Sequence, residues 1–386
     1  MSSGRLREFV QGFGPAWIVM IADVDAPSVL TAAAVGATYS YGLIWFFLLL
    51  IPPLFIIQEA SGRIGIATGK GLGEVIRENY SRKVSAIAGV PMAVVDVVSY
   101  VAEFTGIAIG LDVVGVPPIV SMPLAYLVNL AIVLKRGMAT IERILLGISA
   151  ILIVSYAGSL IARGLIKSQA FYVSSTPQYF FLLAASVGAV VMPFMLFYQA
   201  SATAKKGSVR LWAMRTETLV GAVASEIGMV VIAMATAGLA PSLQLSDPKA
   251  LAAGLSSIAG AYAPYLFAVG LVAAAFTALV VISLASSWAM VDAFGWKKRG
   301  FYWVYAIETL PAAVVPILYP DPLNLALNLM VVFVFILIGP GVLLGLLAQN
   351  QRIMGVMASR GAWRVAYWVC LAFVISFGVI AVFALL

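Results

Sequence analysis

Long apolar stretches follow one another along the whole chain and constrain its fold more than any other feature. A transmembrane helix needs about 20 predominantly apolar residues, and roughly eleven such stretches can be marked in the 386-residue sequence. Hydrophobic residues make up 63% of the chain and charged residues only 10%, which excludes a water-soluble globular protein. We therefore predict an all-α polytopic membrane protein with about 11 transmembrane helices. The predicted spans lie near residues 12–36, 41–61, 85–112, 117–134, 140–162, 178–203, 217–240, 261–290, 301–319, 323–347 and 363–385.

The basic residues predict how the chain is oriented in the membrane. If eleven spans begin from a cytoplasmic N-terminus, all but three of the 23 Lys and Arg residues fall on the cytoplasmic side. The exceptions are Arg163, Lys167 and Lys249. Because cytoplasmic loops carry an excess of Lys and Arg, this split predicts a multi-pass protein of the cell membrane with a cytoplasmic N-terminus and an extracytoplasmic C-terminus. Topology thus explains the net charge of +7, and no nucleic-acid partner is expected.

Two residue types that many active sites need are scarce or absent. The chain has no histidine and a single cysteine, Cys370, which excludes Ser-His-Asp hydrolysis, imidazole zinc sites, internal disulfides and CxxC redox motifs. The sequence also contains no phosphate-binding loop and no sizeable extramembrane segment. We therefore expect neither an enzyme nor a receptor, and no cofactor. The sequence leaves the oligomeric state open and is compatible with a monomer in the lipid bilayer.

Six acidic residues fall within predicted spans, where a charged side chain costs at least about 2.5 to 3.5 kcal/mol. They are Asp23, Asp25, Asp96, Glu103, Glu226 and Glu308. The candidates for a proton or second-ion path are Asp23, Asp96, Glu103 and Glu226. For Glu103 a hydrogen-bonded structural carboxyl is the alternative. Glu308 is expected to bond a neighbouring helix, with a transport role as the alternative. Acids near helix ends are expected to reach water, among them Glu59, Asp112, Glu142, Glu217 and Asp292.

The first span carries two acids next to a proline, in the sequence Asp23-Val24-Asp25-Ala26-Pro27. Pro27 has no backbone N–H and disfavours helical geometry at Ala26, so the helix is predicted to break near the middle of the membrane. Secondary transporters coordinate ions with carbonyls that are freed at such breaks. A simple proline kink is the alternative. Asp23 and Asp25 cannot share one face of a regular helix.

A second mid-span proline, Pro193, follows Met192 in the sixth span. Broken helices at corresponding positions in two five-helix halves indicate an inverted-repeat transporter. The thioether of Met192, beside carboxylate oxygens, would favour transition metals over Mg2+ and Ca2+; the alternative for a single methionine is core packing. We predict one transporter domain over residues 1–386, with repeats at about 12–165 and 175–347 and an additional helix at 363–385.

Six short motifs are spread over the chain. They are Gly14-Pro15-Ala16-Trp17, Ile21-Ala22-Asp23-Val24-Asp25-Ala26-Pro27-Ser28, Thr68-Gly69-Lys70, Ala102-Glu103-Phe104-Thr105-Gly106, Gly188-Ala189-Val190-Val191-Met192-Pro193 and Arg352-Ile353-Met354-Gly355. Together they resemble the Nramp family of divalent metal transporters over nearly the whole chain. The resemblance implies a leucine-transporter-like fold of five plus five inverted helices plus one. It also implies transport of Mn2+, Fe2+ and related dications into the cell, usually with protons.

The resemblance further implies a set of metal ligands. The family's metal-binding aspartate falls on Asp25, and its asparagine ligand falls on Ser28, whose hydroxyl can still offer an oxygen. The carbonyls of Ala22 and Ala189 and the sulfur of Met192 fall on the remaining ligand positions. The metal ion is the transported substrate, so no resident cofactor is implied.

Other family positions are changed in this sequence. Tyr100 stands for the first of two third-span acids, Phe194 for the histidine tied to proton handling, Tyr305 for the ninth-span arginine, and Met330 or Ile336 for the tenth-span glutamine. Asp23 and Glu226, in turn, are acids where the family usually has uncharged residues. We therefore expect proton coupling to be weak or altered.

These observations predict a secondary transporter of divalent metal ions that works by alternating access. Met192 favours transition metals such as Mn2+ and Fe2+ over Mg2+. A Mg2+ transporter related to the Nramp family is one alternative, favoured by the second acid at the break and by Ser28 in place of asparagine. An amino-acid or solute symporter on the same fold is another, but two aspartates at the break would repel a substrate carboxylate.

Overall fold

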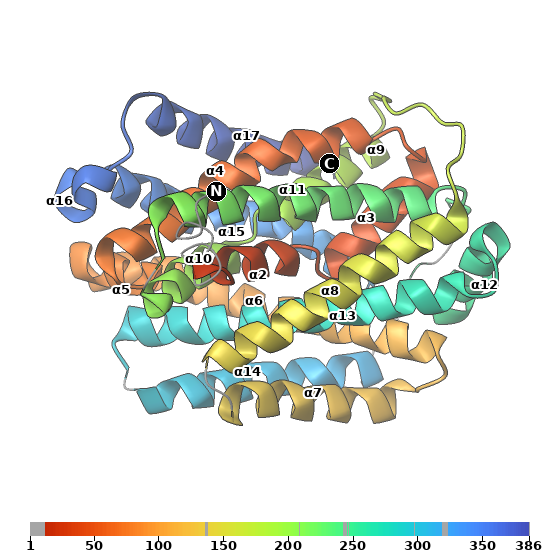
Figure 1. The fold of residues 1–386 in the computed structure, drawn as a ribbon, viewed down its shortest axis with the longest axis horizontal. Helices are drawn as coiled ribbons and strands as arrows, with labels where there is room; N and C mark the ends of the chain where they lie inside the picture. The colour runs from red at the N-terminus through yellow and green to blue at the C-terminus, as the bar shows by residue number, and fades with distance from the viewer. Residues whose placement is uncertain are drawn as a thin grey trace, which may run out of the picture.

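The computed structural model describes residues 12–135, 138–207, 209–241, 245, 247–296, 298–318 and 323–385. Within these residues every regular element is a helix (Figure 1), so the predicted all-α class is confirmed. In chain order the helices are α2 (Pro15–Ala22), α3 (Ala26–Tyr39), α4 (Ile44–Thr68), α5 (Leu72–Asn79), α6 (Arg82–Val113), α7 (Pro118–Lys135), α8 (Met138–Arg163), α9 (Pro177–Val190), α10 (Pro193–Lys206), α11 (Leu211–Thr236), α12 (Pro248–Ala259), α13 (Ala263–Phe294), α14 (Lys298–Leu318), α15 (Leu323–Gln349), α16 (Gln351–Met354), the 3-10 turn η1 (Gly355–Met357) and α17 (Gly361–Leu385).

Local sequence explains many of the helix boundaries. Prolines occupy the first turn of α9, α10 and α12, where the missing N–H would have had no partner in any case. The hydroxyl of Ser81 caps α6 by accepting from the backbone N–H of Val84. At the other ends, α4 and α10 stop at Gly69 and Gly207, which adopt the left-handed conformation that ends many helices.

The described helices account for most of the predicted spans. Eight helical segments are long and apolar enough to cross a membrane: α4, α6, α8, the α9–α10 pair, α11, α13, α15 and α17. The bent pair α2–α3 makes a ninth. Helices α7 and α14 contain shorter apolar segments, Pro118–Leu134 and Trp303–Leu318. The count of eleven stays a prediction, because it requires both of these shorter helices to cross as well.

The two broken helices lie deep in the bundle. Helices α2 and α3 pack against α11, while α10 packs against α4 and α13, and α9 packs against α15 and α17. Helix α13 runs along α6 and α8, and α7 and α14 pack on each other at one edge (Figure 1). Of the most apolar window in the span Pro177–Lys206, 89% is buried, compared with 22% in Gly361–Ile380. The segments that contain the breaks are therefore enclosed by the other helices.

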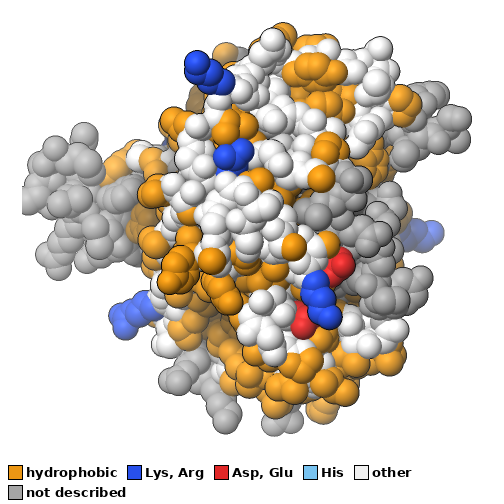
Figure 2. Space-filling model, turned by 90° about the vertical axis from the view of Figure 1, so that its right-hand side faces the viewer, with side chains coloured by type: hydrophobic (Ala, Val, Ile, Leu, Met, Phe, Trp, Pro, Cys, Tyr) orange, Lys and Arg blue, Asp and Glu red, His pale blue; other side chains and the backbone are white. Residues whose placement is uncertain are grey.

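The outer surface has the character of a membrane protein. Large hydrophobic side chains are exposed on α7 and α8, including Ile119, Leu127, Val154 and Ile161, as expected where a helix faces lipid. Figure 2 shows the end of the bundle that lies at the right of Figure 1, near α12, where charged side chains are scattered among hydrophobic and uncharged atoms. Which end faces the cytoplasm stays a prediction.

Candidate functional site

The first broken helix lies between α2 and α3. Helix α2 ends at Ala22, α3 begins at Ala26, and the two are bent by 51°. Asp25 has an extended backbone and caps α3, with its Oδ1 accepting from the backbone N–H of Ser28 at 2.8 Å. Pro27 lies in the first turn of α3, and because it lacks an N–H it offers no helical donor to the carbonyl of Asp23. The break predicted from Pro27 is confirmed.

Glu103 of α6 shapes this first break. In a continuous helix the N–H of Ala26 would donate to the carbonyl of Ala22. Instead it donates to Oε2 of Glu103 at 3.1 Å. The carbonyl of Ala22 therefore lacks the N–H from which it would accept in a continuous helix. Gly106, one turn further along α6, makes the contact possible, because a Cβ at that position would overlap the Cβ of Ala26. Glu103 is thus a buried carboxyl bonded to the break itself.

The second broken helix lies between α9 and α10. Helix α9 ends at Val190 and α10 begins at Pro193, so Val191 and Met192 leave the helix, and Met192 is extended. The missing N–H of Pro193 leaves the carbonyl of Ala189 without its helical donor. This carbonyl accepts from the hydroxyl of Ser28 at 3.3 Å, so the two breaks meet.

The five predicted ligand residues are all buried. Ala22, Asp25, Ser28, Ala189 and Met192 are each at most 1% exposed. None of the ion pairs between described residues involves Asp25. The set combines one carboxylate, one hydroxyl, two carbonyls and one thioether, which mixes hard oxygen with softer sulfur as a divalent transition metal prefers.

No three acids, cysteines or histidines among the described residues come together as a metal cage. A metal site in this part of the chain therefore depends on neutral ligands beside a carboxylate. Met330 and Ile336 are the two candidates for the tenth-span position. The backbone of Met330 lies directly against Gly188 of α9, next to Ala189. The backbone of α15 at Met330 thus passes close to the second break.

The remaining predicted acids form two other groups. Asp23 accepts from the hydroxyl of Ser225 at 2.7 Å, and the neighbouring Glu226 is fully buried in α11. Asp96 lies about 10 Å along α6 from Glu103, where it interacts with Glu308 rather than with the breaks. The hydroxyl of Tyr100 donates to Glu308 at 3.1 Å, so the expected bond of Glu308 to a neighbouring helix is confirmed.

Three acids expected to reach water do not: Glu59, Glu142 and Glu217 are buried, and Glu142 pairs with Lys206 at 2.8 Å. Glu59 is 0% exposed and forms ion pairs with Arg63 at 3.1 Å and Arg215 at 2.8 Å. Glu217 is 2% exposed and accepts from the backbone N–H groups of Gly14 at 2.7 Å and of Trp17 at 2.9 Å, which caps the amino end of α2. The expectation was wrong because it considered distance from the helix end and not the charged or N–H partners that make burial possible. The spacing of Glu59 and Arg63 was the one available signal.

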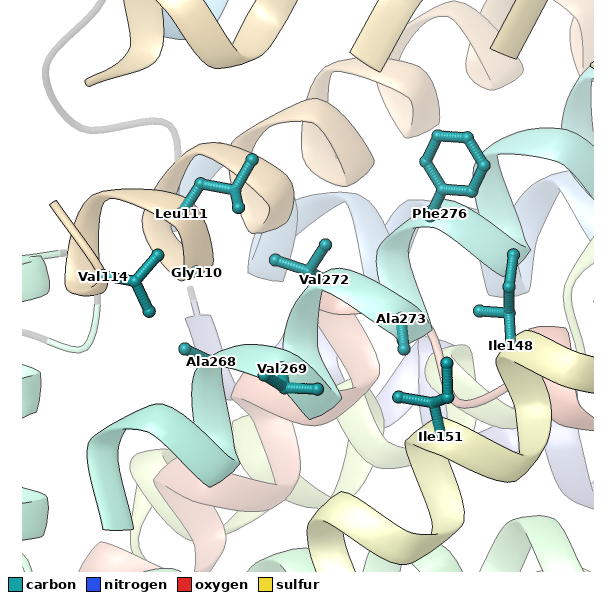
Figure 3. A pocket seen from close by; sticks show the side chains of 10 residues that line it. All are labelled: Gly110, Leu111, Val114, Ile148, Ile151, Ala268, Val269, Val272, Ala273 and Phe276. Atoms are coloured by element: carbon teal, nitrogen blue, oxygen red, sulfur yellow. The ribbon is translucent and has the colours of Figure 1, made fainter. Parts of the chain in front are cut away.

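An apolar groove elsewhere in the described residues is separate from the ion site. A groove of about 280 Å³ lies between α6, α8 and α13 and is lined by apolar side chains, among them Ile148, Val272 and Phe276 (Figure 3). Such a lining offers no ligand to a cation. The candidate site at the breaks is instead enclosed, with its polar atoms turned toward one another.

Comparison with known proteins gives a family. The family model described as natural resistance-associated macrophage protein-like, Nramp, matches residues 16–384. The divalent metal cation transporter MntH of Klebsiella pneumoniae (strain 342) is 29% identical over 378 residues, which covers 94% of this chain and 91% of the relative. MntH of Pectobacterium carotovorum subsp. carotovorum (strain PC1) is 27% identical over 375 residues, covering 91% and 88%.

Solved structures show the same fold. The Eremococcus coleocola manganese transporter, in complex with an aromatic bis-isothiourea substituted compound, matches with a TM-score of 0.82 at 18% identity and covers 99% of this chain and 88% of its own. Mhp1, a nucleobase-cation-symport-1 family transporter, matches with a TM-score of 0.64 at 14% identity, covering 97% and 90%. Because the family model covers nearly the entire sequence, this chain belongs to the Nramp family.

Proposed function

We propose that this chain is a secondary transporter that moves divalent metal ions across the cell membrane by alternating access, with Mn2+-like transition metals as its substrates. The observation that carries the proposal is the meeting of two helix breaks at the Ser28–Ala189 hydrogen bond. The names of the MntH relatives and of the manganese transporter structures support it. We also propose the division into repeats at about 12–165 and 175–347 with an additional helix at 363–385.

Each ligand has a distinct role in this proposal. Asp25 supplies the negative charge that attracts a dication. The carbonyls of Ala22 and Ala189 and the hydroxyl of Ser28 replace part of its water shell, since unwound carbonyls are the usual ion ligands of secondary transporters. The sulfur of Met192 disfavours hard ions such as Mg2+. Proton coupling is weak or altered, because the sequence has no histidine to accept a proton near the site.

Contacts at the amino end of α2 support alternating access. Glu217 of α11 holds the first N–H groups of α2, and Lys206 of α10 forms an ion pair with Glu142 of α8 at 2.8 Å. Lys206 also donates to the carbonyl of Phe13, just before α2. These bonds join α2 to three other helices. A path that opens beside α2 would have to break them, so these contacts are suited to act as a gate.

A Mg2+ transporter is the second candidate function. It is favoured by the oxygen-rich first break, where Asp23, Asp25 and Ser28 lie within a few residues. Hard cations prefer carboxylate and hydroxyl oxygens. The thioether of Met192 is the one feature of the ligand set that argues against Mg2+.

Uptake into proteoliposomes tests the proposal. The purified protein should take up Mn2+, and Fe2+ and Cd2+ should compete better than Ca2+ or Mg2+. Asp25→Asn keeps the side-chain volume but removes the charge, and we expect its uptake to fall about 100-fold or more, because loss of one partner of a buried charge pair costs at least about 3 kcal/mol. Uptake by Asp25→Asn at the wild-type rate would refute the site. Stronger competition by Mg2+ than by Cd2+ would favour the second candidate.

A further inference from the structure

Helix α11 lies alongside both halves of the first broken helix, α2 and α3. Gly221 lies against the side chain of Met20 in α2, and Ser225 bonds Asp23 at the end of α2. Further along, Thr236 donates toward a carbonyl of α3 at 3.3 Å. The part of α11 around residues 225–228 therefore lies at the level of the break.

Two buried acids, Asp23 and Glu226, lie near each other at this level. Asp23 is 2% exposed and Glu226 is 0% exposed, and they interact electrostatically. The hydroxyl of Ser225 satisfies Oδ2 of Asp23 at 2.7 Å. Oδ1 of Asp23 and both carboxylate oxygens of Glu226 have no hydrogen-bond partner among the described residues. Burying ionised carboxylates without partners costs several kcal/mol, so these two acids either hold protons or bind a cation.

The surroundings supply oxygen but no positive charge. None of the ion pairs between described residues involves Asp23 or Glu226, and the other charged group that acts on Asp23 is the acid Asp25. The carbonyl of Asp23 lacks its helical donor because Pro27 has no N–H. Ser225 keeps its oxygen lone pairs while its hydrogen is donated to Asp23. The group therefore offers an all-oxygen set of ligands.

We propose that Asp23, Ser225 and Glu226 form a second cation site, separate from the metal site at Asp25 and Met192, which binds a dehydrated sodium ion together with the transported metal. An all-oxygen set selects hard cations over transition metals. Mg2+ usually keeps several of its waters, and Ca2+ takes about 6 to 8 oxygen ligands, so a buried pair of carboxylates with one hydroxyl and one carbonyl suits a dehydrated monovalent ion better. Carbonyls at unwound helix segments are known ligands of Na+ in secondary transporters.

This proposal rests on the proposed function, which it extends by naming a driving ion. A sodium ion bound between Asp23 and Glu226 would tie α2 to α11 while the metal ion occupies the neighbouring break. Metal binding and Na+ binding would then support each other, because both need the same arrangement of the broken helix. The absence of histidine would be compensated by coupling to Na+ in place of protons.

The experiment uses the purified full chain in proteoliposomes and in detergent. Radioactive sodium binding is measured in choline chloride at constant ionic strength, and Mn2+ uptake is compared with and without an inward Na+ gradient. We expect the wild type to bind Na+ and to take up Mn2+ several-fold faster with the gradient. Glu226→Gln keeps the shape of the side chain. Its affinity for Na+ should fall about ten-fold or more, and its Mn2+ uptake should no longer respond to the Na+ gradient. Glu308→Gln, the same change at a partly buried acid of α14, is the matched control and should retain both.

The outcomes separate the two proposals. Asp25→Asn should lose Mn2+ binding but still bind Na+. Mn2+ uptake by the wild type that is the same in Na+ and choline, with no Na+ bound, would overturn the second site while leaving metal transport standing. Wild-type Na+ affinity in Glu226→Gln would overturn it as well. If Glu226→Gln does not fold, Ser225→Ala serves instead, with Na+ binding expected to weaken several-fold and an unchanged affinity counting against the site.

Discussion

The two broken helices of this protein are held open in different ways. Between α2 and α3 three residues leave the helix, two of them acidic, and the halves are bent by 51°. Between α9 and α10 only Val191 and Met192 leave the helix, and the two halves still count as one span from Pro177 to Lys206. The first break is charged and bent, and the second is apolar and less bent.

Their supports differ too. The first break depends on other helices: Glu103 of α6 takes the N–H of Ala26, Ser225 of α11 bonds Asp23, and Glu217 of α11 caps the far end of α2. The second is opened by its own Pro193, its outer end is capped by the nearby Thr176, and another helix reaches it through the bond from Ser28 to Ala189. A break that other helices maintain can change when those helices move. We infer that the first break is the moving half of the site and the second is the fixed half.

Glu103 offers the largest test of this difference. Glu103→Leu should leave the N–H of Ala26 without an acceptor, so that it returns to the carbonyl of Ala22 and removes a metal ligand. Loss of a buried hydrogen-bond partner costs about 1 to 3 kcal/mol, so the affinity for Mn2+ should fall about 10- to 100-fold. Isothermal titration of the purified protein with Mn2+ measures this change.

Glu103→Gln is the matched control, because its amide oxygen can still accept from Ala26. We expect Mn2+ affinity close to that of the wild type. If Glu103→Leu and Glu103→Gln weaken Mn2+ binding equally, the charge of Glu103 matters and the freed carbonyl of Ala22 does not. If neither weakens it, the first break does not depend on α6.

Met192 offers a smaller test, on the second break. Met192→Leu keeps the apolar volume but removes the sulfur. It should therefore change the selectivity between ions more than the rate of transport. We expect the ratio of Mn2+ to Mg2+ affinity to fall about ten-fold, since only the softer ion gains from a thioether. Competition uptake of the two ions measures the ratio, and an unchanged ratio would show that the second break does not set selectivity.

Local chemistry decided which parts of the site the sequence could reveal. Proline acts on its own backbone and on its neighbours, so Pro27 and Pro193 located both breaks, and Asp25 and Met192 were found beside them. The apolar stretches predicted the helices for the same reason. These features can be recognised from the local sequence alone, without knowing which residues lie next to them in the folded protein.

The partners of the first break could not be predicted in this way. Whether Glu103 meets Ala26 depends on the close approach that Gly106 allows between α6 and α3. The bonds of Ser225 and Glu217 likewise depend on α11 lying along α2, about 200 residues away in sequence. An acidic residue in an apolar stretch indicates that it has a partner in the folded protein, but the sequence does not identify which residue that is. This is why Glu217 was expected in water and was found capping a helix.

Ser28 offers the smallest test, because it joins the two breaks. Its hydroxyl donates to the carbonyl of Ala189 at 3.3 Å, while its backbone N–H holds Asp25. Ser28→Ala removes only the first bond, whose net contribution is about 0.5 to 1.5 kcal/mol, so Mn2+ affinity should fall about three-fold. Ser28→Thr keeps the hydroxyl and should bind as the wild type does. A loss in Ser28→Ala as large as that of Asp25→Asn would mean that the hydroxyl is a principal ligand and that the fixed and moving halves are joined by the ion alone.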